Sequence, residues 1–187
     1  MVYVFLAEGF EEVEALTPVD CLRRAGVEVK TAGVGGKVIN GAHGIPVQCD
    51  ITAGEIVLDS ALQMIVLPGG MPGTKNLEAD ADVQRAIAYC AENGIYIGAI
   101  CAAPSILGHL GLLNGKTAVC YPGFEPALTG AKIGNAPAVK DGKFITAKGP
   151  GAALHFGLSL VAALTDHAAA QKLAAGMIFT GGAGDIA

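Results

Sequence analysis

The stretch Ile95-Tyr-Ile-Gly-Ala-Ile-Cys-Ala-Ala-Pro104 joins an apolar strand to the start of a helix. Pro104 suits the first turn of that helix, where its missing N–H costs nothing. The corner between strand and helix forces Cys101 into a strained conformation with its side chain exposed, as in a nucleophile elbow. Such a corner tolerates only small neighbours, and the sequence supplies Gly98, Ala99, Ala102 and Ala103.

Outward from this corner, short apolar runs alternate with amphipathic segments along the chain. We predict strands over residues 2–6, 27–34, 64–67, 95–100 and 117–119, and a further strand or hairpin arm over 45–52. We predict helices over residues 11–25, 80–93, 151–164 and 166–176, and another that begins near 104. Asp141-Gly142 marks a hairpin between residues 139–140 and 144–147.

This alternation predicts an α/β fold, with a mostly parallel sheet and helices on both of its faces. No linker or internal repeat divides the chain, so we expect residues 1–187 to form one domain. Its glycine-rich end, residues 179–187, is expected to be a loose tail. In the first helix, apolar residues at a spacing of three are expected to face the core: Val13, Leu16, Val19 and Leu22.

The composition narrows the class of protein. The chain has 187 residues, 52% of them hydrophobic, with a net charge of −5. This acidic balance, without a Lys/Arg cluster, argues against a nucleic-acid partner. No apolar run approaches the ~20 residues of a membrane helix, so the mean hydropathy of +0.50 indicates a buried sheet and no membrane partner. The start, Met1 to Leu6, lacks the features of a secretory signal.

The cysteines indicate a reducing compartment, which we take to be the cytoplasm. Their number is odd, and no C-x-x-C pair or zinc-like spacing occurs, so no metal is expected. They are Cys21, Cys49, Cys90, Cys101 and Cys120.

Sites in open parallel sheets lie at the carboxyl ends of the strands. Cys101 occupies one such end, and the start of the following helix favours its thiolate. Gly69 and Gly70 follow another strand, and their N–H groups with that of Ala102 would form an oxyanion hole. The residues alone leave two alternatives open, a buried structural cysteine and an ordinary glycine turn.

Glu14 has mostly apolar helical neighbours, Phe10, Pro18 and Cys21. Such a setting raises the pKa of a carboxyl group and favours its protonated form, which can donate a hydrogen bond to a thiolate. A solvated surface glutamate is the alternative. No nucleotide cofactor is predicted, since residues 70–75 lack the Gly-Lys-Ser/Thr order of a phosphate loop and residues 33–38 break the G-x-G-x-x-G pattern.

Several segments recur together in one known family. They are Ala7-Glu-Gly-Phe-Glu-Glu-Val-Glu14, Pro18-Val-Asp20, Leu22-Arg-Arg-Ala-Gly26, Val66-Leu-Pro-Gly-Gly70, Ala99-Ile-Cys-Ala-Ala-Pro104 and Lys148-Gly-Pro-Gly151. In combination they resemble the DJ-1/PfpI family, and its DJ-1/ThiJ/YajL branch most closely. The resemblance implies a flavodoxin-like sandwich and a homodimer. It also implies that Cys101 is the nucleophile, that Glu14 is the protonated acid bonded to its sulfur, and that Gly70 and Ala102 form the anion pocket.

The resemblance further implies a function in oxidative and carbonyl stress. Members are assigned glutathione-independent glyoxalase activity, which converts methylglyoxal to lactate, and deglycation of adducts. We therefore expect a small reactive dicarbonyl or a glycated substrate, with no metal or organic cofactor. The alternative is a redox sensor or chaperone that acts through oxidation of Cys101 to sulfinic acid.

Three residues depart from patterns found among relatives. Ala102 follows the nucleophile where the protease-like branch carries His, so a Cys-His protease pair is not supported. Tyr121 precedes Pro122 where some relatives place a His near the pocket, so Tyr121 is a possible pocket residue, and another hydrolase or hydratase is a third alternative. His43 sits where relatives carry an arginine that reaches the partner subunit's pocket, and the same role is expected here; a simple turn histidine is the alternative.

Overall fold

The computed structural model describes residues 1–181 and 186–187, and its centre is a seven-stranded sheet. In spatial order the strands are β10 (Ala138–Asp141), β11 (Phe144–Ala147), β7 (Tyr96–Ile100), β6 (Met64–Leu67), β1 (Val2–Leu6), β2 (Val29–Gly33) and β5 (Ile51–Thr52). All neighbours pair parallel except β10 and β11, which form the predicted antiparallel hairpin.

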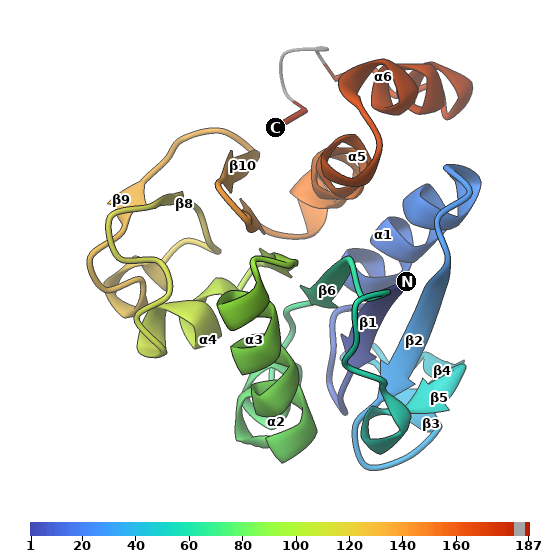
Figure 1. Ribbon diagram of the computed structural model, residues 1–187, viewed down its shortest axis with the longest axis vertical. Helices are drawn as coiled ribbons and strands as arrows, with labels where there is room; N and C mark the ends of the chain where they lie inside the picture. The colour runs from blue at the N-terminus through green and yellow to red at the C-terminus, as the bar shows by residue number, and fades with distance from the viewer. Residues whose placement is uncertain (182–185) are drawn as a thin grey trace.

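Helices cover both faces of this sheet (Figure 1). They are α1 (Glu12–Arg24), α2 (Gly73–Ala79), α3 (Ala81–Asn93), α4 (Pro104–His109), α5 (Ala153–Leu164) and α6 (His167–Gly176). Alternate residues of β1 point to opposite faces: Tyr3 and Phe5 pack with α3 and α4, whereas Val2 and Val4 pack with α1, α5 and α6. Every residue of β1 and β6 is buried, as expected for strands covered on both sides.

Two small sheets lie outside the central one. The segment predicted over residues 45–52 divides between β4 (Pro46–Gln48), which pairs with β3 (Val38–Asn40), and β5 of the central sheet. A second pair joins β8 (Thr117–Ala118) to β9 (Lys132–Ile133). Short 3-10 turns complete the fold at Ala53–Glu55, Glu125–Ala127 and Pro150–Ala152.

The buried face of α1 differs from the prediction. Val13 and Leu16 are 49% and 38% exposed, while Val19 and Leu22 are buried as expected. A spacing of three falls short of the helical repeat of 3.6, so the predicted stripe drifts around the helix and leaves the core at its N-terminal half. Helix α2 was not predicted, because its start at Gly73 follows a Pro- and Gly-rich turn.

The end of the chain also differs from the prediction of a loose tail over residues 179–187. Residues 182–185 lie outside the described part. On either side of them, the Phe179 ring packs edge-on against His155, Ile186 is buried, and the Ala187 N–H donates to the Ser159 hydroxyl. Among the described residues, no helix has the length and apolarity that a membrane crossing requires.

Candidate active site

Cys101 sits at the carboxyl end of β7, in the conformation that its sequence context predicted. Its φ of 65° lies in the left-handed region, which non-glycine residues rarely adopt. The Cys101 N–H donates to the Ala147 carbonyl at 2.9 Å, and its carbonyl accepts from the Tyr121 N–H at 2.8 Å. These two bonds hold the strained backbone between β11 and the segment after β8, and the thiol stays partly exposed.

Glu14 reaches the same place from the first turn of α1, which follows β1 at the same edge of the sheet. Its side chain is fully buried, and its Oε2 accepts the Gly69 N–H at 3.0 Å. Its Oε1 has no hydrogen-bond partner among the described residues. Burial raises the pKa of Glu14 to about 7, against the opposing hydrogen bonds from Cys101 and Gly69. Glu14 is thus a neutral acid below pH 7, as predicted.

Gly69 is where Cys101 and Glu14 come together. A Cβ at this position would lie 2.6 Å from both the Cys101 Cβ and the Glu14 Oε2, so only glycine fits. Its N–H is already donated to Glu14 and is not free for an oxyanion, which differs from the predicted role. Gly70, with φ of 90°, and Ala102 direct their N–H groups to the Cys101 sulfur.

The charge of the thiol differs from the prediction. Burial and, to a lesser degree, the Glu14 carboxyl group together raise the pKa of Cys101 to about 12, although hydrogen bonds from the N–H groups of Gly70 and Ala102 oppose the rise. Helix α4 has six residues and begins only at Pro104, so its dipole does not compensate for burial. With pKa values of about 7 for Glu14 and about 12 for Cys101, the carboxyl group loses its proton before the thiol does.

The remaining predicted residues fall in two places. Tyr121 is 46% exposed and lies beside the site, where its ring approaches Gly149. His43 lies instead against the start of α1, with its Nδ1 2.9 Å from the Glu12 Oε2 and 3.7 Å from the Glu11 Oε1. Its own N–H donates to the Glu12 Oε1 at 2.8 Å, which places it in a turn tied to α1.

Glu11, Glu12 and His43 are also the group whose geometry could hold a metal ion, since their ligand atoms lie within 4.8 Å of one another. Burial alone would raise the pKa of Glu12, but hydrogen bonds from the His43 side chain and from backbone N–H groups lower it overall. The pKa of His43 is raised by its bond to Glu12. Within this cluster, Glu12 and His43 therefore form a hydrogen-bonded ion pair.

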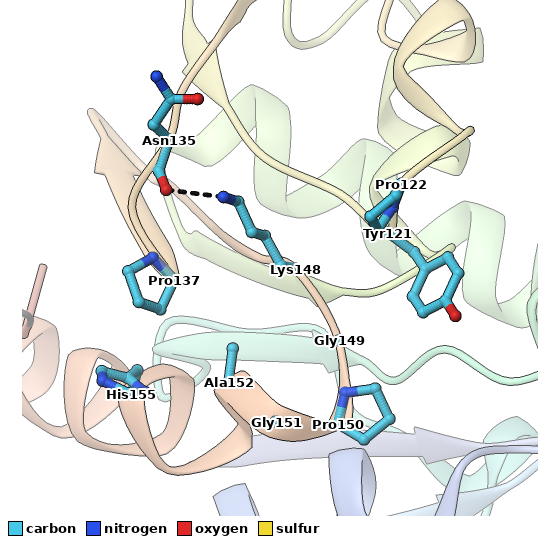
Figure 2. Close-up of a pocket in the computed structure, with 10 residues that line it drawn as sticks. All are labelled: Tyr121, Pro122, Asn135, Pro137, Lys148, Gly149, Pro150, Gly151, Ala152 and His155. Carbon is cyan, nitrogen blue, oxygen red and sulfur yellow. Dashed lines mark hydrogen bonds between the residues drawn. The ribbon is translucent and has the colours of Figure 1, made fainter. Parts of the chain in front are cut away.

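A cavity of about 360 Å³ adjoins the site (Figure 2), and of the residues that line it only Tyr121 was predicted as a possible pocket residue. The sequence signal was available: Lys148 and Gly149 directly follow β11, the strand next to β7, and the carboxyl ends of neighbouring parallel strands share one edge. The cavity is lined by Tyr121, Pro122, Asn135, Pro137, Lys148, Gly149, Pro150, Gly151, Ala152 and His155.

The sheet order and the cysteine elbow define an α/β protein of flavodoxin-like architecture. The chain matches the DJ-1/PfpI family over residues 1–163 and belongs to that family. It is 33% identical over 178 residues to Protein dj-1beta of Drosophila melanogaster, covering 94% of this chain and 95% of that protein.

Two further relatives extend the comparison. A protein from Pyrococcus abyssi named a deglycase is 32% identical over 152 residues, which is 80% of this chain and 90% of that protein. The structure of oxidized Toxoplasma gondii DJ-1 has a TM-score of 0.91 at 32% identity, covering 96% of this chain and 98% of that one. The resemblance expected from the sequence, in family and in fold, is confirmed.

Proposed function

We propose that this protein is a cysteine-dependent, glutathione-independent glyoxalase or deglycase that acts on small α-dicarbonyls or their adducts. The observation that supports this most directly is the pairing of Cys101 with a buried Glu14 whose pKa is about 7. A group with a pKa near neutral pH works equally well as a proton donor and acceptor. The relative named a deglycase supports the same class of reaction.

In this mechanism the Cys101 sulfur adds to the aldehyde carbon of methylglyoxal and forms a hemithioacetal. The N–H groups of Gly70 and Ala102 hold the oxygen of the adduct. Glu14 removes the hydrogen of the former aldehyde carbon as a proton, which gives an enediol, and returns the proton to the adjacent carbon. The product is a thioester of lactate.

Water then hydrolyses the thioester, which releases lactate and restores the Cys101 thiol. The overall change is methylglyoxal plus water to lactate. One carbon is oxidised as its neighbour is reduced, so the reaction consumes no external oxidant or reductant. On a carbinolamine adduct, the Cys101 sulfur would instead displace the amine, which leaves with the thiol proton, and the resulting hemithioacetal would follow the same course.

The test is lactate production from methylglyoxal without glutathione, by the wild type and by the Cys101→Ser and Glu14→Gln variants. We expect both variants to lose most of the turnover, about 100-fold or more for the acid–base residue. Glu28→Gln is the control, since Glu28 is exposed just before β2, at the opposite edge of the parallel sheet from the Cys101 end of β7. Full turnover in Cys101→Ser contradicts the proposal.

A redox sensor is the second candidate, because Cys101 is the one cysteine of the five that is not fully buried. Oxidation to sulfinate would place a charged group where Glu14 can donate a hydrogen bond. Peroxide should then add two oxygen atoms, about 32 Da, at Cys101 alone. That result together with no glyoxalase turnover would favour the sensor.

We also propose a homodimer, as the family resemblance implies. Val13 and Leu16 expose apolar side chains on α1, and Ile45 does so in the loop that carries His43. A second copy would cover this face and bring His43 towards the partner subunit's pocket. Light scattering should give a dimer for the wild type and a monomer for Leu16→Glu. Leu110→Glu, on another exposed leucine just after α4, should stay dimeric. A monomeric wild type contradicts this proposal.

A further inference from the structure

The cavity beside the site is larger than a three-carbon dicarbonyl needs. Its volume is about 360 Å³, and a water molecule takes roughly 30 Å³ of the liquid. By that scale the five non-hydrogen atoms of methylglyoxal would fill less than half of the space. Cavities of this size suit ligands that bring a substantial apolar portion.

Three contacts place the cavity next to the reacting groups. Its wall residue Lys148 directly follows Ala147, whose carbonyl accepts the Cys101 N–H at 2.9 Å. Tyr121, another wall residue, donates its N–H to the Cys101 carbonyl. A Cβ on Gly149 would stand 3.9 Å from the Glu14 Oε1, the carboxyl oxygen without a partner among the described residues.

The walls of the cavity are mainly apolar, and one of them is fixed by an aromatic contact. Figure 2 shows Pro137 and His155 at one end, Tyr121 and Pro122 at the other, and Lys148 between them. The His155 ring packs edge-on against Phe179, with ring centres 4.9 Å apart. An apolar group of a ligand would pack along these rings and prolines.

Lys148 brings the one positive charge to this lining. Its Nζ donates to the Asn135 carbonyl at 2.6 Å, which leaves two of its three N–H groups for a ligand. It has no carboxylate within ion-pair distance among the described residues. A cation tethered in an apolar cavity without a counter-ion favours an anionic ligand group.

We propose that the cavity selects an α-oxoaldehyde, or an adduct of one, that is longer than methylglyoxal and ends in an anionic group held by Lys148. This inference rests on the proposed reaction at Cys101 and names the substrate class for it. The aldehyde would face Cys101, the apolar portion would lie between Tyr121 and His155, and the anion would meet the Lys148 ammonium.

The test compares phenylglyoxal with 4-carboxyphenylglyoxal, a pair that differs only in the anionic group. In the wild type we expect kcat/KM to be higher for the carboxylated substrate. Lys148→Met should lower that preference about tenfold, the loss expected for a hydrogen bond to a charged group. Lys172→Met, which removes an equal charge on α6 outside this cavity, should leave the preference unchanged.

A second readout does not need turnover. 4-Carboxybenzaldehyde should slow iodoacetamide alkylation of Cys101 more than 4-methylbenzaldehyde does, and Lys148→Met should abolish the difference. Turnover of methylglyoxal with equal kcat/KM for the two phenylglyoxals would overturn the inference and leave the proposed function standing. If no dicarbonyl is turned over, the proposed function fails, and equal protection by the two aldehydes overturns the cavity assignment as well.

Discussion

Glu12 and Glu14 stand two residues apart on α1, and both are nearly inaccessible, with exposures of 5% and 0%. Glu12 receives two hydrogen bonds from His43, one from its N–H and one from its ring, and its pKa is lowered. Glu14 receives the Gly69 N–H, leaves one oxygen unpaired among the described residues, and has a pKa of about 7.

The difference shows that burial alone does not decide the charge of a carboxyl group. The number of donors that reach its oxygens, and the charge of those donors, offset the cost of removing it from water. Glu12 holds a charged histidine at the surface, whereas Glu14 keeps a proton that a reaction at Cys101 can use. One turn of helix thus carries a structural ion pair and an acid–base group.

The largest loss of activity is expected when Gly69, which packs against Glu14, is replaced, and Gly41, which packs against Glu12, gives the comparison. In Gly69→Ala the new Cβ would meet the Cys101 Cβ and the Ile100 carbonyl, which cannot move away. A nucleophile displaced by about 1 Å loses roughly 100-fold in rate. In Gly41→Ala the three atoms nearest the new Cβ all belong to the Glu12 side chain, which can turn aside. Comparing kcat/KM of the two variants checks this, and equal losses would refute it.

The next effect concerns stability and pH. Glu14 has a folded-state pKa of about 7, above its ordinary 4.5, so the folded state binds more protons between these values. Stability is therefore lost as the pH rises from 4.5 through 7, by roughly 3 kcal/mol. Urea unfolding at pH 5 and pH 8 should show this loss in the wild type. Glu14→Gln should lack that part of the loss, and an unchanged pH dependence in the variant would count against a protonated Glu14.

A smaller effect is expected on the thiol. The Glu14 carboxylate raises the pKa of Cys101, so Glu14→Gln should lower it by about 1–3 pH units. The pH profile of iodoacetamide alkylation measures this pKa. Glu12→Gln is the control and should leave the profile as in the wild type, since its partner is His43. A profile that moves upward in Glu14→Gln would show that Glu14 acts on the sulfur in another way.

The smallest effect is expected at His43. Its pKa is raised by the hydrogen bond to Glu12, so the ion pair is complete below the ordinary pKa of 6.5 and is lost as the pH rises through the folded-state value. Proton NMR titration should show the His43 pKa fall in Glu12→Gln and stay unchanged in Glu14→Gln. A shift in the second variant instead would mean that the two carboxyl groups are coupled.

Much of this site follows from local sequence. The apolar run ending at Cys101, with alanines after it and Pro104 beyond, allows few structures other than an elbow. The apolar neighbours of Glu14 likewise predicted a neutral acid. Other features depend on contacts between distant segments. The Gly69 N–H donates to the carboxyl group of Glu14, 55 residues earlier in the chain, and is therefore not free to bind an oxyanion.

The sequence by itself determined the parallel α/β sheet, the strained Cys101 and the family, because alternating apolar runs and small residues at a sharp corner act through near neighbours. Only the tertiary structure decided the exposed Val13 and Leu16, the high pKa of the thiol, and the cavity that Lys148 shares with Tyr121 and His155. All three features depend on which residues are buried and on which charges lie near them. Both are established only when the strands and helices pack together.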